Sequence, residues 1–222
     1  MCSDGELIGQ YCQNSGLTHS RTLLSMVESL LKNLCLSVSD MDIVAVSHGP
    51  GSFTGVRIGV SAAKGLAWGA DKLVCGVSTL EAMAYQTPEQ GVLLCPVMDA
   101  RRSQVYNALF EWRDETLVRL CADRAISLDD LAKELNPAKP NPILNIPNAH
   151  VYLIGDGATI SYEHLSAAGI SCRIAPRLMR YQTAYGVALA AMRAEPIPPA
   201  DLKPIYLRPS QAERESGART TV

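Results

Sequence analysis

Hydrophobic residues along the first third of the chain alternate between helical spacing and unbroken runs. From about residue 20 to residue 36, apolar side chains recur three and four positions apart, which predicts an amphipathic helix. Apolar stretches at 41–47 and 73–77 predict buried strands, and a further strand is expected over 6–13. A short helix is predicted over 79–85. This alternation indicates parallel strands covered by helices.

The rest of the chain repeats this organisation after a hinge predicted at 87–91. Strands are predicted over 92–98, 104–111 and 151–154, and helices over 128–135, 158–168 and 180–193. The first two of these strands are expected to pair across the turn at Asp99–Arg102. Four prolines predict an exposed loop over 136–149, and the polar residues after Arg208 are expected to fray.

The composition is that of an ordinary globular α/β protein, with 47% hydrophobic residues, 19% charged residues and a net charge of −2. A net negative charge argues against a protein that binds nucleic acid on its own. No run of about 18 apolar residues is present, which predicts no membrane span. The first residues lack the pattern of a secretory signal. We therefore expect a cytoplasmic protein without membrane contact.

Cysteine and histidine residues are scattered along the chain. The seven cysteines include no Cys-x-x-Cys pair, and Cys75 and Cys95 lie in apolar runs. This pattern favours reduced, buried thiols over disulfides or a metal site. The four histidines include no pair at the spacing that places two ligands on one helix face. The sequence therefore predicts no metal centre.

The most distinctive segment is a glycine-proline turn that joins the strand at 41–47 to a helix of small residues. Gly49 and Gly51 allow the backbone to turn where a side chain would be excluded, and Ser52 or Thr54 can cap the helix. Free amide groups at such a junction can bind phosphates. The spacing fits neither a Walker loop nor the standard dinucleotide fingerprint, so a phosphate site and a plain tight turn both stay open.

Two neighbouring helices carry more apolar or small residues than one buried face requires. The predicted helix at 20–36 has leucines on two adjacent faces, and the helix after the glycine turn contains several interior glycines. An interior glycine costs a helix up to about 1 kcal/mol relative to alanine, and close approach of another backbone is the usual compensation. Both helices are therefore candidates for a docking surface. The alternative is that both are simply part of the core.

Several motifs, in order along the chain, resemble those of one known family. The run from Gly49 to Gly59, followed by Ala63-Lys-Gly-Leu-Ala67, is similar to the signature of the TsaB family. The family's other motifs are resembled by Gly76-Val-Ser-Thr-Leu-Glu81, Met98-Asp-Ala-Arg101 with Val105-Tyr106, and Pro204-Ile-Tyr-Leu-Arg208. The resemblance covers nearly the whole chain.

This resemblance implies an α/β fold with two RNase H-like halves of the actin-like ATPase fold, in which mixed sheets have flanking helices. Residues 1–88 would form the N-terminal half, which also carries the docking helices. Residues 89–222 would form the C-terminal half and its tail. Chains of this fold open with a long strand and an acidic turn, whereas only three residues precede Asp4-Gly5 here. We therefore expect the first strand to be missing and the true start to lie upstream of Met1, which an intact-mass measurement would decide.

The TsaB family is a non-catalytic scaffold and activator in the complex that forms N6-threonylcarbamoyladenosine in tRNA. By resemblance, the chain would not be an enzyme by itself. It would dimerise with the catalytic subunit TsaD, act alongside the ATPase subunit TsaE, reach tRNA only through the complex, and form a homodimer when alone. The expected partner interface consists of Leu23, Leu24, Val27, Leu30, Leu31, Gly55, Val56, Gly59, Val60 and Ala63.

An alternative is a free-standing nucleotide-dependent enzyme of the same fold, kinase-like, ATPase-like or glycoprotease-like. Such kinases and ATPases need an acidic turn in each half, and Asp99 stands at that turn of the second half only. TsaD holds a metal with paired histidines on a helix, which this chain lacks. We expect no cofactor of its own, with ATP or ADP at the subunit junction. The candidate nucleotide-binding residues are Gly49, Gly51, Ser52, Thr54, Asp99, Gly155 and Gly157.

Overall fold

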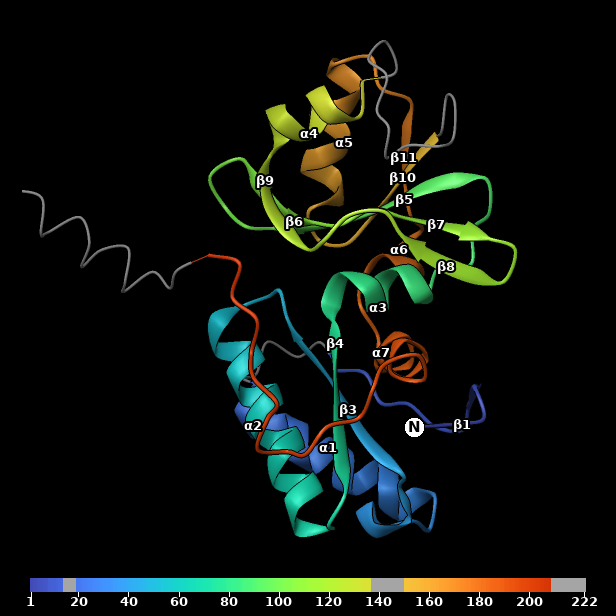
Figure 1. The fold of residues 1–222 in the computed structure, drawn as a ribbon, viewed down its shortest axis with the longest axis vertical. Coiled ribbons are helices and arrows are strands. Elements are labelled where there is room, and N and C mark those ends of the chain that lie inside the picture. Colours follow the sequence, from blue (N-terminus) through green and yellow to red (C-terminus); the bar gives the residue numbers. More distant parts are fainter. Residues whose placement is uncertain (14–18, 137–149, 209–222) are drawn as a thin grey trace, which may run out of the picture.

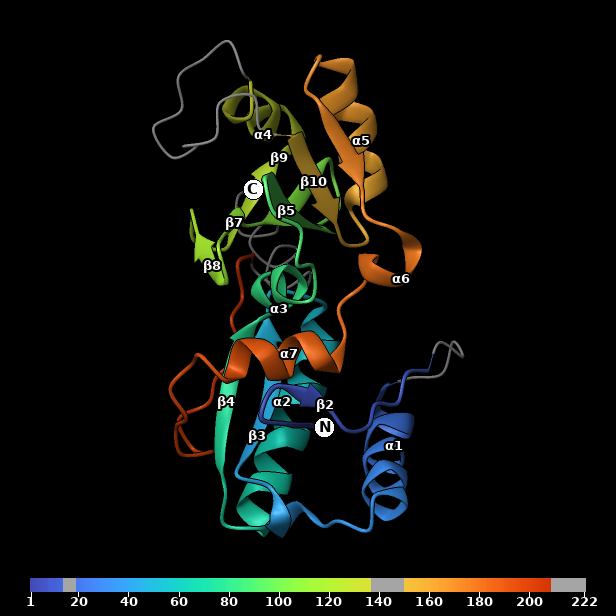
Figure 2. The same ribbon diagram turned by 90° about the vertical axis from the view of Figure 1, so that its right-hand side faces the viewer.

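The computed structural model describes residues 1–13, 19–136 and 150–208, and these form two α/β parts arranged end to end (Figure 1). Helices α1 and α2 with strands β3 and β4 occupy one end, and the larger sheet with α4 and α5 occupies the other. Helices α3 and α7 lie between the two parts in both views (Figures 1 and 2). The predicted loop at 136–149 and the tail lie, from 137 and 209 onward, outside the described residues.

The first part is built on two parallel strands, β3 and β4, with a register running from Ile43 opposite Leu73 to Ser47 opposite Val77. Its elements are β1 (Cys2–Ser3), β2 (Glu6–Leu7), α1 (His19–Asn33), a 3-10 turn η1 (Val38–Asp40), β3 (Ile43–Gly49), α2 (Phe53–Gly69), β4 (Leu73–Ser78) and α3 (Thr79–Tyr85). The strands and helices predicted between 20 and 85 are confirmed, with shifts of a few residues at their ends.

The strand predicted over 6–13 is wrong in extent. Backbone turns at Asp4 (φ 49°) and Gly5 (φ 86°) fold β2 back onto β1 as a two-stranded hairpin. The chain then runs alongside α1, where a Cβ on Gly9 would lie 2.9 Å from Leu30 Cδ1. The segment after β2 therefore packs against α1 and does not pair as a strand.

The second part contains the larger sheet, in the order β11-β10-β5-β6-β9, with the β7–β8 hairpin attached to β5. Strands β10 and β11 run parallel to β5, and β6 pairs back on β5 as predicted. Its elements are β5 (Val92–Asp99), β6 (Gln104–Asn107), β7 (Phe110–Arg113), β8 (Thr116–Arg119), β9 (Arg124–Ser127), α4 (Leu128–Glu134), β10 (His150–Ile154), α5 (Ala158–Ala167), β11 (Cys172–Ile174), α6 (Arg177–Arg180) and α7 (Ala184–Ala191).

The helix predicted over 180–193 is instead two helices separated by extended residues. Gln86, the residue that follows α3, explains the break: its amide nitrogen donates to the carbonyls of Met179 and Tyr181 at 3.1 and 2.6 Å. Its oxygen accepts from Thr183 N at 3.0 Å, and the Thr183 side chain caps α7 by accepting from Gly186 N. The predicted strand at 104–111 is likewise divided, into β6 and β7.

The two parts differ in how completely their strands are buried. Residues Val151–Ile154 of β10 are all buried, because β10 lies between β5 and β11. None of the residues 43–48 of β3 is buried, and within the described chain β3 pairs only with β4. The Ser47 hydroxyl is enclosed there without a hydrogen-bond partner among the described residues. The main core therefore lies in the second part.

Residues 196–208, here called the C-terminal strap, return to the first part. Ile197 bridges to Val74 of β4, and the Lys64 ammonium on α2 donates to the carbonyls of Ala200 and Leu202 at 3.1 and 3.2 Å. The strap, red in Figure 1, then runs along α2 toward the second part. Helix α7 also packs on α3 and on β3 and β4. The division of the chain into halves at 1–88 and 89–222 stays a prediction. The C-terminal strap belongs to the second half in sequence but packs on the first part.

Candidate functional site

The strap closes over the glycine turn at the end of β3. Gly49 adopts φ 128°, and a Cβ there would collide with the carbonyl oxygen of Ile205. The Ile205 amide in turn donates to the His48 carbonyl at 2.7 Å. Ser52 caps α2 by accepting from Gly55 N at 3.4 Å, as expected from the sequence. The strap therefore requires glycine at position 49, since a side chain there would have no room.

A second turn, at the end of β10, packs against the end of β5. Gly155 adopts φ 116°, and a Cβ there would collide with the Val97 carbonyl oxygen. A Cβ on Gly157 would lie 3.1 Å from Asp99 N, and that amide donates to Asp156 Oδ1 at 3.0 Å. The two glycines are thus explained by close packing of backbone on backbone.

The structure brings the two groups of predicted nucleotide residues to neighbouring turns. A Cβ on Gly51 would lie 3.9 Å from Met98 Cε, at the end of β5. The strap residue Arg208 links the turns further, because its guanidinium donates to the Ala100 carbonyl. Asp99 has a local role, since its Oδ1 accepts from Arg101 N at 2.7 Å. This contact is the turn-capping role that short acidic side chains often play.

The turn between β5 and β6 is strained. Arg101, Arg102 and Ser103 adopt φ values of 66°, 57° and 53°, in the left-handed region that glycine favours. Each such residue costs about 1–2 kcal/mol. Hydrogen bonds from Gln104 N to the Arg101 carbonyl and from Leu128 N to the Ser103 carbonyl, at 3.3 and 3.0 Å, hold the turn. Sequence reasoning missed this strain because the turn contains no glycine.

A cluster of aromatic and cationic groups joins the start of α2 to the strap. The Arg57 guanidinium lies 4.0 Å from the centre of the Phe53 ring, and its Nε donates to the Tyr206 hydroxyl at 2.8 Å. The Phe53 and Tyr206 rings are 4.9 Å apart. Such contacts contribute about 0.5–1 kcal/mol each at exposed sites. They fix the strap beside the glycine turn.

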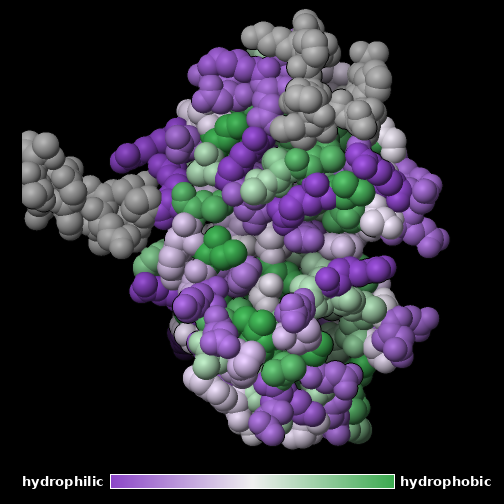
Figure 3. All heavy atoms as spheres, in the orientation of Figure 1, coloured by the Kyte–Doolittle hydropathy of each residue, from purple (hydrophilic) through white to green (hydrophobic). Residues whose placement is uncertain are grey.

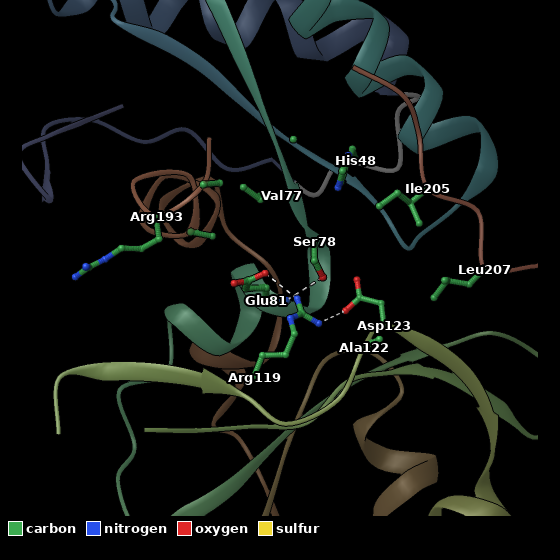
Figure 4. Close-up of a pocket in the computed structure, with 13 residues that line it drawn as sticks. His48, Val77, Ser78, Glu81, Arg119, Ala122, Asp123, Arg193, Ile205 and Leu207 are labelled. Carbon is green, nitrogen blue, oxygen red and sulfur yellow. Dashed lines mark hydrogen bonds and ion pairs between the residues drawn. The ribbon is translucent and has the colours of Figure 1, made fainter. Parts of the chain in front are cut away.

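A cleft of about 460 Å³ lies between the two parts, below the end of β3. Figure 4 shows the Arg119 guanidinium between two carboxylates, at 2.7 Å from Glu81 and 2.6 Å from Asp123. Burial lowers the pKa of Arg119, but the hydrogen bonds to Asp123 and Glu81 outweigh it and raise this pKa above its usual value. Among the described residues lining the cleft, none is a predicted nucleotide residue. Arg119 and Asp123 are only four residues apart, whereas Glu81 lies 38 residues before Arg119, so the sequence around Arg119 could not indicate its pairing with Glu81.

The ten predicted interface residues fall into two environments. On α1 none of the residues 20–33 is buried, and Leu24 is 53% exposed; Leu23, Val27, Leu30 and Leu31 are half-buried. On α2, Val56, Val60 and Ala63 are buried in the chain's own core, while Gly55 and Gly59 are half-buried. The outer side of α2 instead presents Gly65 and Trp68, the latter 61% exposed. Figure 3 shows apolar residues scattered among hydrophilic ones on one face of the molecule.

The comparison with protein families decides the family. A family model described as TsaD, tRNA N6-adenosine threonylcarbamoyltransferase, matches residues 13–210. The chain belongs to the TsaD family. The expected resemblance is confirmed by relatives in this family that are named TsaB, tRNA threonylcarbamoyladenosine biosynthesis protein.

Among these relatives, TsaB of Bacillus subtilis is 36% identical over 138 residues, which is 62% of this chain and 60% of the relative. TsaB of Escherichia coli is 41% identical over 99 residues, which is 44% of this chain and 42% of the relative. The chain thus matches less than two thirds of the length of each.

The fold is shared with a crystal structure from Pseudomonas aeruginosa of an uncharacterized protein with similarity to peptidase YEAZ. The TM-score is 0.68 at 25% identity, covering 86% of this chain and 85% of the other. The predicted fold class is thereby confirmed. In the described part of this TsaD-family chain, no helix is long and apolar enough to cross a membrane. Nor do the described residues include three or more His, Cys, Asp or Glu grouped to hold a metal ion.

The stability of this TsaD-family chain is expected to fall as the pH drops below about 6.5. Burial lowers the pKa of His48, and the opposing effects of the Lys203 backbone and Asp123 are smaller. The unfolded histidine therefore binds a proton at a pH where the folded one does not. The contribution of His48 to the free energy of unfolding is fully present above the unfolded pKa and is lost as the pH falls below it. Urea midpoints at pH 7.5 and 5.5 measure this. His48→Gln should reduce the difference between them, and an unchanged difference would contradict the assignment.

Proposed function

We propose that this chain acts in the formation of N6-threonylcarbamoyladenosine in tRNA, as a scaffold that binds and activates the catalytic subunit TsaD. The relatives named TsaB support a role in threonylcarbamoyladenosine biosynthesis. The exposed apolar surface of α1 supports a role in binding a protein partner. TsaE is proposed as a further member of the complex, with tRNA as the substrate that the complex modifies. The apolar side chains of α1, none of which is buried between residues 20 and 33, carry this proposal.

Helix α1 has an apolar face that its own chain covers only in part, with Leu23, Val27, Leu30 and Leu31 half-buried. Helices of this length are marginal in water and depend on packing for stability. Leu24 projects from α1 with 53% of its surface exposed, and Leu7, Ile8 and Tyr11 nearby in sequence are 42–47% exposed. A partner helix that covers this face would bury apolar surface worth about 25 cal/mol per Å². The surface is therefore suited to a protein partner.

Helix α2 adds a second feature that suits a close helix contact. Gly65 lies inside the helix and is exposed, and a Cβ there would meet nothing within 4 Å among the described atoms. Glycine in this position costs about 1 kcal/mol relative to alanine. Among the described residues, no close contact at Gly65 offsets this loss of helix stability. A partner backbone approaching α2 closely would explain the residue.

The variant Gly65→Ala is expected to raise the free energy of unfolding of the isolated chain by about 0.5–1 kcal/mol, because alanine favours the helix. Gly65→Leu should leave the isolated chain folded, since the space is open, and weaken binding to TsaD by holding the helices apart. Urea unfolding and titration calorimetry measure the two effects. A destabilised Gly65→Ala variant, or full affinity in Gly65→Leu, would contradict this account of Gly65.

The direct test is light scattering coupled to size-exclusion chromatography, on the chain alone and mixed with TsaD of the same organism. We expect a stoichiometric heterodimer in the mixture, and a homodimer through the same surface when the chain is alone. TsaE would then be added to the heterodimer. If a well-folded chain and TsaD elute separately, the scaffold role is wrong.

The cleft between the two parts favours a second candidate, a free-standing nucleotide-dependent enzyme. Its charged lining includes Arg119, Arg193 and Glu81, which could contact a nucleotide and its metal ion. Arg119 is already held by two carboxylates, which weakens this candidate. Calorimetric titration of the isolated chain with Mg-ATP and with ADP, followed by a turnover assay, tests it. The same titration on the heterodimer tests for nucleotide at the junction beside the glycine turn.

A further inference from the structure

The β5–β6 turn presents two adjacent arginines to solvent. The Arg101 side chain is 85% exposed, and Arg102 is exposed beside it. Within the described residues Arg102 forms no ion pair, and Arg101 meets only Asp99, at 3.7 Å. An exposed pair of this length is weak. Both guanidinium groups are thus available to an anionic ligand.

Contacts with three other segments hold the turn in place. Its carbonyl groups accept from Arg208 on the strap, from Gln104 N and from Leu128 N. The acidic side chains at its base, Asp99 and Asp156, each accept a backbone amide. A turn held in this way loses little conformational freedom when its side chains bind, which favours affinity.

The cationic surface continues beyond the turn. The strap carries Arg208 beneath the turn and Tyr206 two residues earlier, where the exposed Arg57 contacts the Tyr206 hydroxyl. Tyr206 is 40% exposed, so part of its ring is accessible although it also packs on Phe53. Arginine binds phosphate oxygens with two parallel hydrogen bonds, and aromatic rings can stack on bases. The chain as a whole has a net charge of −2, so this concentration of cations is local.

We propose that the Asp99–Ser103 turn, with the adjoining strap, contacts the phosphate backbone of tRNA when this chain is in its complex with TsaD. The inference rests on the proposed function. The arginines lie on an open surface without a closed pocket, which fits an extended polyanion better than a single phosphate. The contact is independent of base sequence, because it is made by guanidinium groups to phosphates. It would make the scaffold subunit part of the RNA-binding surface.

The test is the affinity of the heterodimer for a labelled tRNA transcript, measured by fluorescence anisotropy at several salt concentrations. The double variant Arg101→Glu with Arg102→Glu should weaken binding at least tenfold and reduce the salt slope by about 1–2, the value for one or two lost phosphate contacts. The double variant to lysine should keep the wild-type salt slope. The matched control, Arg177→Glu with Arg180→Glu on α6, makes the same change in charge and should leave binding within twofold.

Light scattering on each variant separates this inference from the proposed function. If the glutamate variant forms the heterodimer and binds tRNA with wild-type affinity and salt slope, the inference is wrong while the scaffold role stands. Equal losses in the α6 control would also overturn it, because the effect would then reflect net charge alone. If the unmodified chain forms no heterodimer, the proposed function and this inference fail together.

Discussion

Replacing Leu24 with glutamate should abolish the complex with TsaD while leaving the isolated chain folded. Leu24 is 53% exposed, so the change should alter the free energy of unfolding by less than about 0.5 kcal/mol. In the complex, the same carboxylate would be buried against apolar groups without a partner. Such burial should weaken binding roughly 100-fold or more, equivalent to about 3 kcal/mol. Circular dichroism and calorimetric titration with TsaD measure the two quantities.

A matched control is available on the second part of the chain. Leu178 on α6 is 95% exposed, and Leu178→Glu makes the same chemical change outside the proposed surface. It should leave the affinity for TsaD unchanged. Equal losses in the two variants would mean that the effect comes from added negative charge, and undiminished binding by Leu24→Glu would remove α1 from the interface.

The largest expected effect on folding belongs to Gly155→Ala. A Cβ at this position would collide with the Val97 carbonyl oxygen, and the φ of 116° is one that residues with side chains rarely adopt. Collision and backbone strain together should lower the free energy of unfolding by about 3–5 kcal/mol. Since small domains have about 5–15 kcal/mol in total, the variant should be marginal. Urea unfolding followed by tryptophan fluorescence measures the loss.

Gly169→Ala separates the two causes of that loss. Gly169 also has a positive φ, 76°, but a Cβ there would meet nothing within 4 Å among the described atoms. Only the backbone strain remains, which predicts a loss of about 1–2 kcal/mol. Should the two variants lose the same amount, the close approach of β5 and β10 would not be the dominant cause.

The sequence was most informative where local chemistry alone decides the structure. The predicted helix at 79–85 has the observed bounds, because Ser78 caps it by accepting from Glu81 N at 3.2 Å. The glycine turn and its capped helix were likewise predictable, since the turn and the Ser52 cap depend on neighbouring residues. Both caps are specified by residues three positions apart, although the strap also packs on Gly49 from a distance in sequence.

Contacts between distant segments account for what the sequence did not reveal. The break between α6 and α7 depends on Gln86, which follows α3, and the cleft depends on the contact between Arg119 and Glu81. Neither pairing leaves a local pattern. Apolar spacing also could not distinguish a side chain in the chain's own core from one that faces a partner. Val56 is buried and Leu24 is exposed, although the sequence suggested the same role for both.

The sparse pairing of β3 has a consequence for how the protein behaves in solution. The edge of β3 away from β4 has no strand partner in the described part of the chain, and Ile43 at its start is 37% exposed. A bare edge offers its backbone amides and carbonyls as a template on which another strand can add. Sheet proteins usually block such edges with charges, prolines or bulges. The register of β3 is irregular only at its end, between Ser47 and Gly49, and Ile43-Val-Ala-Val before it carries none of these devices. The first part of the molecule is therefore where intermolecular β-aggregation would begin at high protein concentration.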